Sequence, residues 1–346
     1  MNKKIFLQDG KWSCRSCGDC CRGFSFGPVE PEVVQGLIDR KIEEYWPLAK
    51  DGWYVQKPET GEYFFQHRNL HCVFLRPDNH CAIHAEFGSA AKPWFCREFP
   101  FHAIKEPRGI ALRVREECSG FHKSFVDGED ISGQIDDVLE LPRPFPHQDF
   151  NQRNVIILPK VAVSSENWST VEGVLIEKCL GKDPLSLAEF IRNSLLRMAR
   201  RQEMSSDSAK CEQAIKNLVA NFYLSLKNLE VPSILESRKQ ELITIFHLAQ
   251  QKQNMAGTFS DEVSRYFNII FRGRLIGKSF ASIGGIPSFV GLFVFEAIVF
   301  SSIAKTRTVT DIGPLISNWR RFLNIGVFRS QLRRFESLLT TIFFSA

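Results

Sequence analysis

The chain has 346 residues, of which 44% are hydrophobic and 24% charged, and its formal net charge is +5. This length and composition suit a folded, soluble protein of roughly two domains, and the chain is long enough to bury a hydrophobic core. The charge excess is local, because the residues after Ala304 hold seven lysines or arginines against two acids.

The first motif in the chain is a knot of four cysteines with the spacing C-x2-C-x2-C-C. Two residues between thiolates allow a tight turn to aim both sulfurs at one ion, and Gly18 and Gly23 supply backbone freedom for that turn. A second set of four cysteines follows before residue 119. The sequence therefore predicts metal ligation by eight cysteines: Cys14, Cys17, Cys20, Cys21, Cys72, Cys81, Cys96 and Cys118.

The cellular compartment decides between metal ligation and disulfide bonds. The first twelve residues have only a short apolar run, Ile5 to Leu7, and do not resemble a secretory signal. We therefore expect a cytoplasmic protein whose thiols are reduced and available to a metal. The two remaining cysteines, Cys179 and Cys211, stand alone in predicted helices and are expected to be buried as small hydrophobic side chains.

The identity of the metal is left open, because four thiolates suit both zinc and an iron-sulfur cluster. Side chains of adjacent residues tend to point apart, so Cys20 and Cys21 favour a cluster or two neighbouring sites over one ion. Eight thiolates could form two four-cysteine sites, a cluster plus a zinc site, or a cluster with reserve ligands. Three arginines beside the cysteines could offset the negative charge of the thiolates: Arg15, Arg22 and Arg97. Four histidines also lie near the cysteines, but none of them singly is expected to be a ligand: His67, His71, His80 and His84.

The cysteine motifs carry a resemblance to a known family. The segments Cys14-x2-Cys17-Gly-x-Cys20-Cys21-Arg-Gly, Cys72-x-Phe-Leu, Cys81-x-Ile, Pro93-x2-Cys96-Arg-x-Phe-Pro100 and Cys118-x-Gly120 resemble the YkgJ-type cysteine-cluster family, which is described as zinc- or iron-chelating. The resemblance covers about the first 125 residues.

A branch of that family is similar in one further respect. The gap from Cys81 to Cys96, with Phe87-Gly88 inside it, is similar to that of flagellin lysine N-methylase. This implies an S-adenosylmethionine-dependent protein lysine N-methyltransferase as an enzyme hypothesis. Two positions depart from the pattern: His84 replaces a tyrosine and is expected to pack instead of ligating, and Ser119 replaces the methylase's proline.

Glycine-rich nucleotide-binding turns are absent from the sequence. Gly284-Gly285 is followed by Ile286-Pro287, which is not a strand-loop-helix fingerprint. If the protein uses S-adenosylmethionine, the cluster or an unrecognised pocket must hold it. The alternatives are a non-catalytic zinc- or iron-chelating or electron-carrying module, or a metal that staples a small domain.

The pattern predicts an α+β protein, with a small cysteine-rich metal-binding domain of few strands followed by a mainly α-helical domain. We expect the cysteine domain at 1–126, an acidic and proline-rich linker with short strands at 127–168, and the helical domain at 169–346. Within the linker, Pro142, Pro144 and Pro146 mark a loop, and two β-branched strands flank Pro159.

Beyond Ser169 the apolar periodicity is helical. Helices are predicted at Leu185 to Arg201, after the Asp183-Pro184 cap, and at Ser208 to Leu229, Pro232 to Gln251 and Ser260 to Arg274. Phe280 to Ala304 is long enough to span a membrane, but Glu296 near its middle favours a buried helix.

The basic C-terminal tail interleaves bases with apolar residues at Trp319-Arg-Arg-Phe, Phe328-Arg and Arg333-Arg-Phe. The simplest interpretation is a docking helix with a solvated basic face, and contact with a membrane surface is an alternative. Nucleic acid is not an expected partner, because no nucleic-acid-binding fold is apparent. The helical domain is expected to contact a protein substrate or partner.

Overall fold

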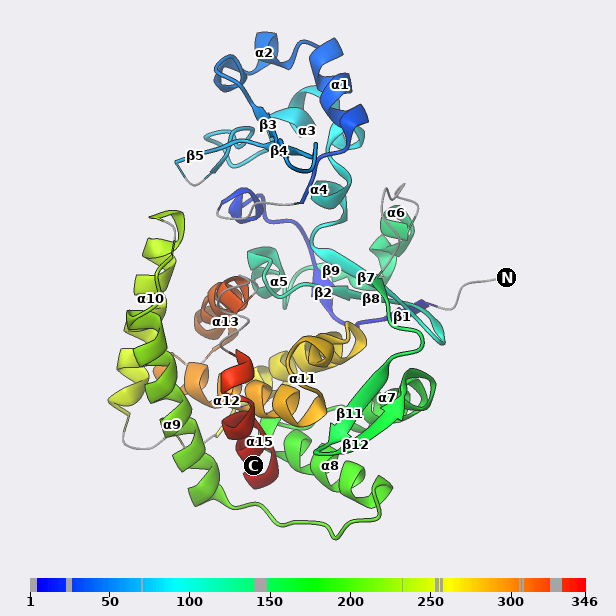
Figure 1. Ribbon diagram of the computed structural model, residues 1–346, viewed down its shortest axis with the longest axis vertical. Helices are drawn as coiled ribbons and strands as arrows, with labels where there is room; N and C mark the ends of the chain where they lie inside the picture. Colours follow the sequence, from blue (N-terminus) through cyan, green and yellow to red (C-terminus); the bar gives the residue numbers. More distant parts are fainter. Residues whose placement is uncertain are drawn as a thin grey trace.

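The fold joins a strand-rich N-terminal region to a mostly helical C-terminal part, as predicted (Figure 1). Helices account for 56% of the described residues and strands for 14%, which confirms the α+β class. The computed structural model describes residues 5–22, 27–69, 71–139, 148–231, 233–252, 255, 258–304, 306, 308–323 and 332–346. The predicted proline loop at Pro142 to Pro146, Gly23 and the Phe328-Arg pair lie outside the described residues.

Residues 27–98, drawn in blue and cyan at the top of Figure 1, form what we call the small lobe. Its buried side chains make a hydrophobic cluster of their own, in which Trp53 and Phe74 pack edge to face. The lobe contains short helices and two small antiparallel hairpins: α1 (Pro31–Asp39), α2 (Ile42–Tyr45), α3 (Ala82–Phe87), α4 (Trp94–Glu98), β3 (Tyr54–Gln56) with β4 (Tyr63–Phe65), and β5 (His67–Arg68) with β6 (His71–Cys72).

A four-stranded sheet lies below the small lobe. Its order is β1 (Ile5–Leu7), β8 (Gly109–Val114), β7 (Phe101–Glu106) and β10 (Gln148–Asp149). Strands β7 and β8 form an antiparallel hairpin, and the two edge strands run parallel to their neighbours. The central strands belong to a second, larger hydrophobic cluster that also contains the C-terminal helices, and we call this part the main body.

The stretch expected to be a linker takes part in this architecture where it is described. Strand β9 (Glu129–Asp130) pairs with β2 (Lys11–Trp12), and the short helix α6 (Ile135–Leu139) follows. The two strands predicted around Pro159 are present as the hairpin of β11 (Asn154–Leu158) and β12 (Val161–Ser164). The domain boundaries at residues 126 and 168 stay predictions.

The helices of the main body follow the predicted pattern closely. Asp183 caps α8 and accepts hydrogen bonds from two backbone N–H groups, with Pro184 at the first helical position. Ser164 and Ser260 cap α7 and α11 in the same way. The described helices are α5 (Ser119–Lys123), α7 (Ser165–Lys178), α8 (Pro184–Met198), α9 (Ser208–Lys227), α10 (Ser233–Gln250), α11 (Asp261–Ile276), α12 (Ile286–Ile303), α13 (Val309–Leu323) and α15 (Glu336–Ser345).

Helix α12 is the core of the main body. Its 18 residues are apolar enough to cross a membrane, yet 89% of them are buried inside the protein. The prediction of a buried helix for this segment is therefore confirmed. Gly285 ends the preceding turn with a φ of 109°, so the helix begins at Ile286 and not at Phe280.

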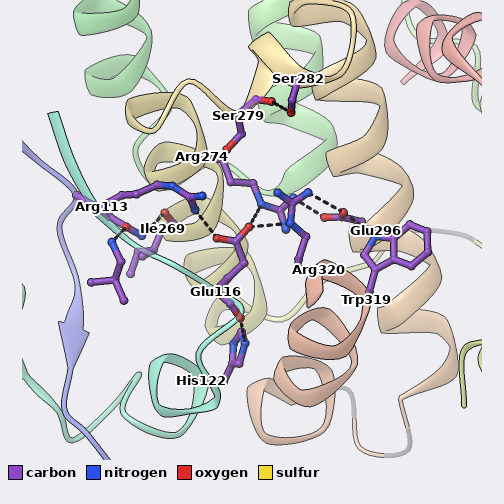
Figure 2. A network of polar contacts seen from close by, with 12 residues as sticks. Arg113, Glu116, His122, Ile269, Arg274, Ser279, Ser282, Glu296, Trp319 and Arg320 are labelled. Atoms are coloured by element: carbon purple, nitrogen blue, oxygen red, sulfur yellow. Dashed lines mark hydrogen bonds and ion pairs between the residues drawn. The ribbon is translucent and has the colours of Figure 1, made fainter. Parts of the chain in front are cut away.

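A buried ion-pair network surrounds Glu296 of α12 (Figure 2). Arg274 pairs with both Glu296 and Glu116, and its Nε lies 2.7 Å from Glu116 Oε1. Arg320 Nε lies 3.0 Å from the same oxygen of Glu116, and Arg113 Nη1 lies 2.7 Å from the other. Burial alone would raise the pKa of Glu116, but the three guanidiniums hold that pKa well below its usual range.

The network corrects one prediction from the sequence. Arg320 and Arg321 do not form a solvated basic face: Arg320 joins the network, and Arg321 donates from Nε to the carbonyl oxygen of Glu117 at 2.8 Å. Both side chains are nearly buried, because α13 packs against the segment around α5. A contact between the tail and a membrane surface stays a prediction.

Candidate metal centre

The first cysteine knot lies on the loop that leaves β2. Cys14 is exposed and Cys17 is partly buried, while Cys20 and Cys21 sit in the single 3-10 turn Asp19–Cys21. Gly18 precedes this turn with a φ of 68°, a left-handed conformation that favours glycine. The predicted use of Gly18 to shape the turn is therefore confirmed.

The second set of cysteines comes from four separate elements. Cys72 ends β6, Cys81 is the N-cap residue of α3, Cys96 lies inside α4, and Cys118 is the N-cap residue of α5. Two backbone bridges bring these elements together. Arg22 pairs with His71 beside Cys72, and Leu75 pairs with Cys81.

Electrostatic coupling shows which thiols are neighbours. Burial raises the pKa of Cys96 well above its usual value, and negative charge on Cys72, Cys81 and Cys20 would raise it further. Burial likewise raises the pKa of Cys72 to about 12 and that of Cys118 to about 11, each with a contribution from Cys20. The charge of Cys20 thus contributes to the pKa of three thiols of the second set.

Cys20 and Cys21 behave differently from the expectation for adjacent residues. Their sulfurs lie 3.9 Å apart, because the 3-10 turn brings both side chains to one side. With Zn–S bonds of about 2.3 Å, two ligands of one tetrahedral ion are about 3.8 Å apart. This separation is compatible with one ion as well as with a cluster, so the choice between zinc and a cluster stays open.

The donor set fits a thiophilic metal such as zinc or iron. All ten cysteines are free of disulfide bonds, and eight of them lie in the N-terminal segments described above. Within the described residues, no three cysteine, histidine or acidic side chains already converge on one ion position. Rotation of the thiols toward a shared centre is thus needed for ligation, and which of the eight bind the metal stays a prediction.

The cysteines lie where the two parts of the protein meet. Cys72 and Cys81 pack against the hydrophobic cluster of the small lobe, whereas Cys118 packs against that of the main body. The loop with Cys20 lies between them, so a metal bound by both sets would join two hydrophobic clusters that are otherwise separate.

Polar neighbours brace the cysteine loop. Arg22 donates from Nη1 to the carbonyl oxygen of Cys17 at 2.5 Å and also hydrogen-bonds Asn79. Arg15 pairs with Asp127 and Ser124 instead of facing a thiol. Asn79 carried no signal in the sequence, because its role depends on a residue 57 positions away.

The histidines of the region lie mostly at the surface, and whether any of them binds the metal stays a prediction. His71, His80 and His84 are exposed, and His67 is partly buried. The expectation that His84 packs in the interior is wrong, because it projects from the solvent side of the short helix α3. The lone cysteines are buried as predicted, Cys179 at the end of α7 and Cys211 in α9.

No curated protein sequence and no solved structure matches this chain. A family model does match its N-terminal third, over the segment that contains all eight clustered cysteines. Residues 13–119 match the model of the CxxCxxCC family, which is described as a putative zinc- or iron-chelating domain.

Proposed function

We propose that the CxxCxxCC domain binds zinc or iron through cysteines of both sets, and that the bound metal fastens the small lobe to the main body. The observation that carries this proposal is the position of Cys20, which is coupled electrostatically to Cys72, Cys96 and Cys118 from three other elements. A metal supplies the Lewis-acidic centre that holds several thiolates together, and the chain supplies the soft ligands.

The small size of the lobe supports a structural role for the metal. Its own hydrophobic cluster contains twelve buried side chains, a small core for an independently folded unit. Metal binding in such domains contributes directly to the free energy of folding. Removal of the metal is therefore expected to loosen the small lobe before the helices of the main body.

The choice between a zinc site and an iron-sulfur cluster is a finer part of the proposal. Metal analysis and an absorption spectrum of anaerobically purified full-length protein test it directly. Iron with sulfide and broad visible absorption that bleaches on reduction supports a cluster. Stoichiometric zinc in colourless protein supports a tetrathiolate site, and protein that retains neither metal contradicts the proposal.

A lysine N-methylase activity is a second candidate, supported by the resemblance described above. Binding of S-adenosylmethionine is part of this candidate. Metal-loaded protein incubated with labelled S-adenosylmethionine and flagellin-like substrate proteins tests this candidate. Absence of both methyl transfer and cofactor binding removes it without affecting the metal proposal. We also propose that the protein is cytoplasmic and that its helical part contacts a protein substrate or partner.

A further inference from the structure

A cavity of about 650 Å³ lies between the small lobe and the main body. Its walls come from α4, from the ends of β7 and β8, and from the residues that follow α11. A volume of this size is typical of pockets for small organic molecules. The metal proposal does not use this cavity, because none of the eight cysteines lines it.

Arg115 places an unpaired positive charge in the cavity wall. Its Nε is hidden from solvent and has no hydrogen-bond partner, and among the described residues no ion pair reaches its guanidinium. Burial lowers the pKa of this side chain, while the negative charges of Glu117, Glu98 and Glu116 raise it. The hidden Nε of this half-buried side chain lacks an acceptor, and the planar fork of a guanidinium matches a carboxylate.

Three other cations of the wall are already paired. Arg113 and Arg320 hold Glu116, as Figure 2 shows, and Lys278 Nζ lies 2.6 Å from Glu106. Arg153 is exposed at the rim, and its guanidinium has no ion pair in the part of the chain that is described. Arg115 and Arg153 are therefore the cations that can receive a ligand.

The same wall limits the charge of the ligand. Glu98 and Glu117 also line the cavity, and their carboxylates disfavour a multiply charged anion such as a triphosphate. One negative charge on the ligand is enough to complement Arg115.

Aromatic rings provide the remaining surface. Trp94, Phe95, Phe99 and Phe101 line the cavity, and they lie in α4, at its C-cap and at the start of β7. Such rings pack well against a flat, apolar ligand body. The cavity thus combines one recognition point for an anion with a broad apolar wall.

We propose that this cavity binds a small organic monoanion, a ring-bearing carboxylate whose carboxyl group pairs with Arg115 and whose ring packs on the aromatic wall. This inference goes beyond metal binding and would hold for a zinc or an iron protein alike. The carboxylate enters from the rim past Arg153, which adds attraction but remains solvated.

The test uses full-length, metal-loaded protein and three acids, benzoate, 2-naphthoate and indole-3-carboxylate, each with its neutral amide. Binding is measured by calorimetry and by quenching of tryptophan fluorescence. We expect at least one acid to bind at least about tenfold more tightly than its amide. Arg115→Met should lose that preference, Arg115→Lys should keep part of it, and the exposed control Arg334→Met should keep all of it.

Three outcomes overturn the proposal: no acid binds, acids and amides bind equally well, or Arg115→Met binds like the wild type. Metal content and circular dichroism establish that each variant is folded. If Arg115→Met does not fold, the comparison of acid with amide on the native protein decides, together with Arg153→Met, which should weaken binding of the acid but not of the amide.

Discussion

Arg274 of α11 and Glu296 of α12 form an ion pair at the centre of the main body, and both side chains are almost completely buried, with 1% and 0% exposed. Trp319 donates a second hydrogen bond to Glu296 from Nε1 at 2.8 Å. An acid in the middle of an apolar helix is thus matched by a cation from a neighbouring helix. This pairing explains how Glu296 can be buried in an apolar helix at the centre of the protein.

Replacement of Glu296 should be strongly destabilising. In Glu296→Gln, Arg274 and Arg320 keep their charges but lose an anionic partner in a buried site, which typically costs about 3–5 kcal/mol. Urea unfolding followed by circular dichroism measures the loss. Glu241→Gln, an exposed position on α10, is the matched control and should change the unfolding free energy by less than about 0.5 kcal/mol. Equal effects of the two substitutions would contradict the role of the network.

Helices α12 and α15 cross at Gly291, where a side chain has no room. A Cβ atom at Gly291 would lie 1.9 Å from the carbonyl oxygen of Leu339. We expect Gly291→Ala to separate these helices and to lower the unfolding free energy by about 1–3 kcal/mol or more. Gly36→Ala on α1 is the control, because a Cβ there meets nothing within 4 Å and alanine is the better helix former. A neutral Gly291→Ala would show that the two helices are less closely packed.

Stability should decrease as the solution becomes acidic, because His122 is buried. Burial lowers the pKa of His122 to about 4, while the unfolded chain has the usual value of 6.5. Between these values the unfolded state binds more protons, so stability is present above pH 6.5 and is lost as the pH falls toward 4. The loss from pH 7 to pH 5 is about 2 kcal/mol.

Urea unfolding at the two pH values measures this loss, and His122→Gln isolates its source. The histidine contacts the carbonyl oxygen of Glu116 through Nε2 at 2.7 Å and the hydroxyl of Tyr266 through Nδ1. The variant should be less stable at pH 7 but should show a smaller difference between pH 7 and pH 5. An unchanged pH dependence in the variant would assign the effect to other groups.

Replacement of a clustered cysteine and of a lone cysteine should differ in their effect on metal binding. Cys20→Ser removes the thiol of the first set that is coupled electrostatically to the second set, so we expect the metal to be bound at least about tenfold more weakly in competition with a chelator. Cys211→Ser, in the interior of α9, should keep the full metal content and lose only a little stability. Full metal retention by Cys20→Ser would exclude this thiol from the site.

Removal of the metal should act unevenly on the two parts of the protein. Hydrogen exchange of chelated protein is expected to increase first in the small lobe, whose cluster is small, and least in α12, which is buried on all sides. Reconstitution with zinc or iron should restore protection. Uniform loosening of both parts would argue against a metal that fastens one to the other.

Local patterns in the sequence determined the helices and the cysteine motif. Asp183-Pro184 marked the start of α8, and the apolar periodicity marked α9 and α11 to within a few residues, because caps and periodicity act over a few positions along the chain. The cysteine spacing likewise identified the CxxCxxCC domain, since thiolate ligands in a tight turn leave a short, recognisable pattern.

Only the tertiary structure decided which distant charges meet. Arg320 was expected at the surface because its local pattern is amphipathic and basic, but its partner Glu116 lies 204 positions earlier and draws it into the core. The free energy of such a pair depends on burial and on the distance between the groups, and neither is encoded in nearby residues. The convergence of Cys20 with Cys72, Cys96 and Cys118, and the unpaired Arg115 in the cavity wall, follow from the same long-range packing.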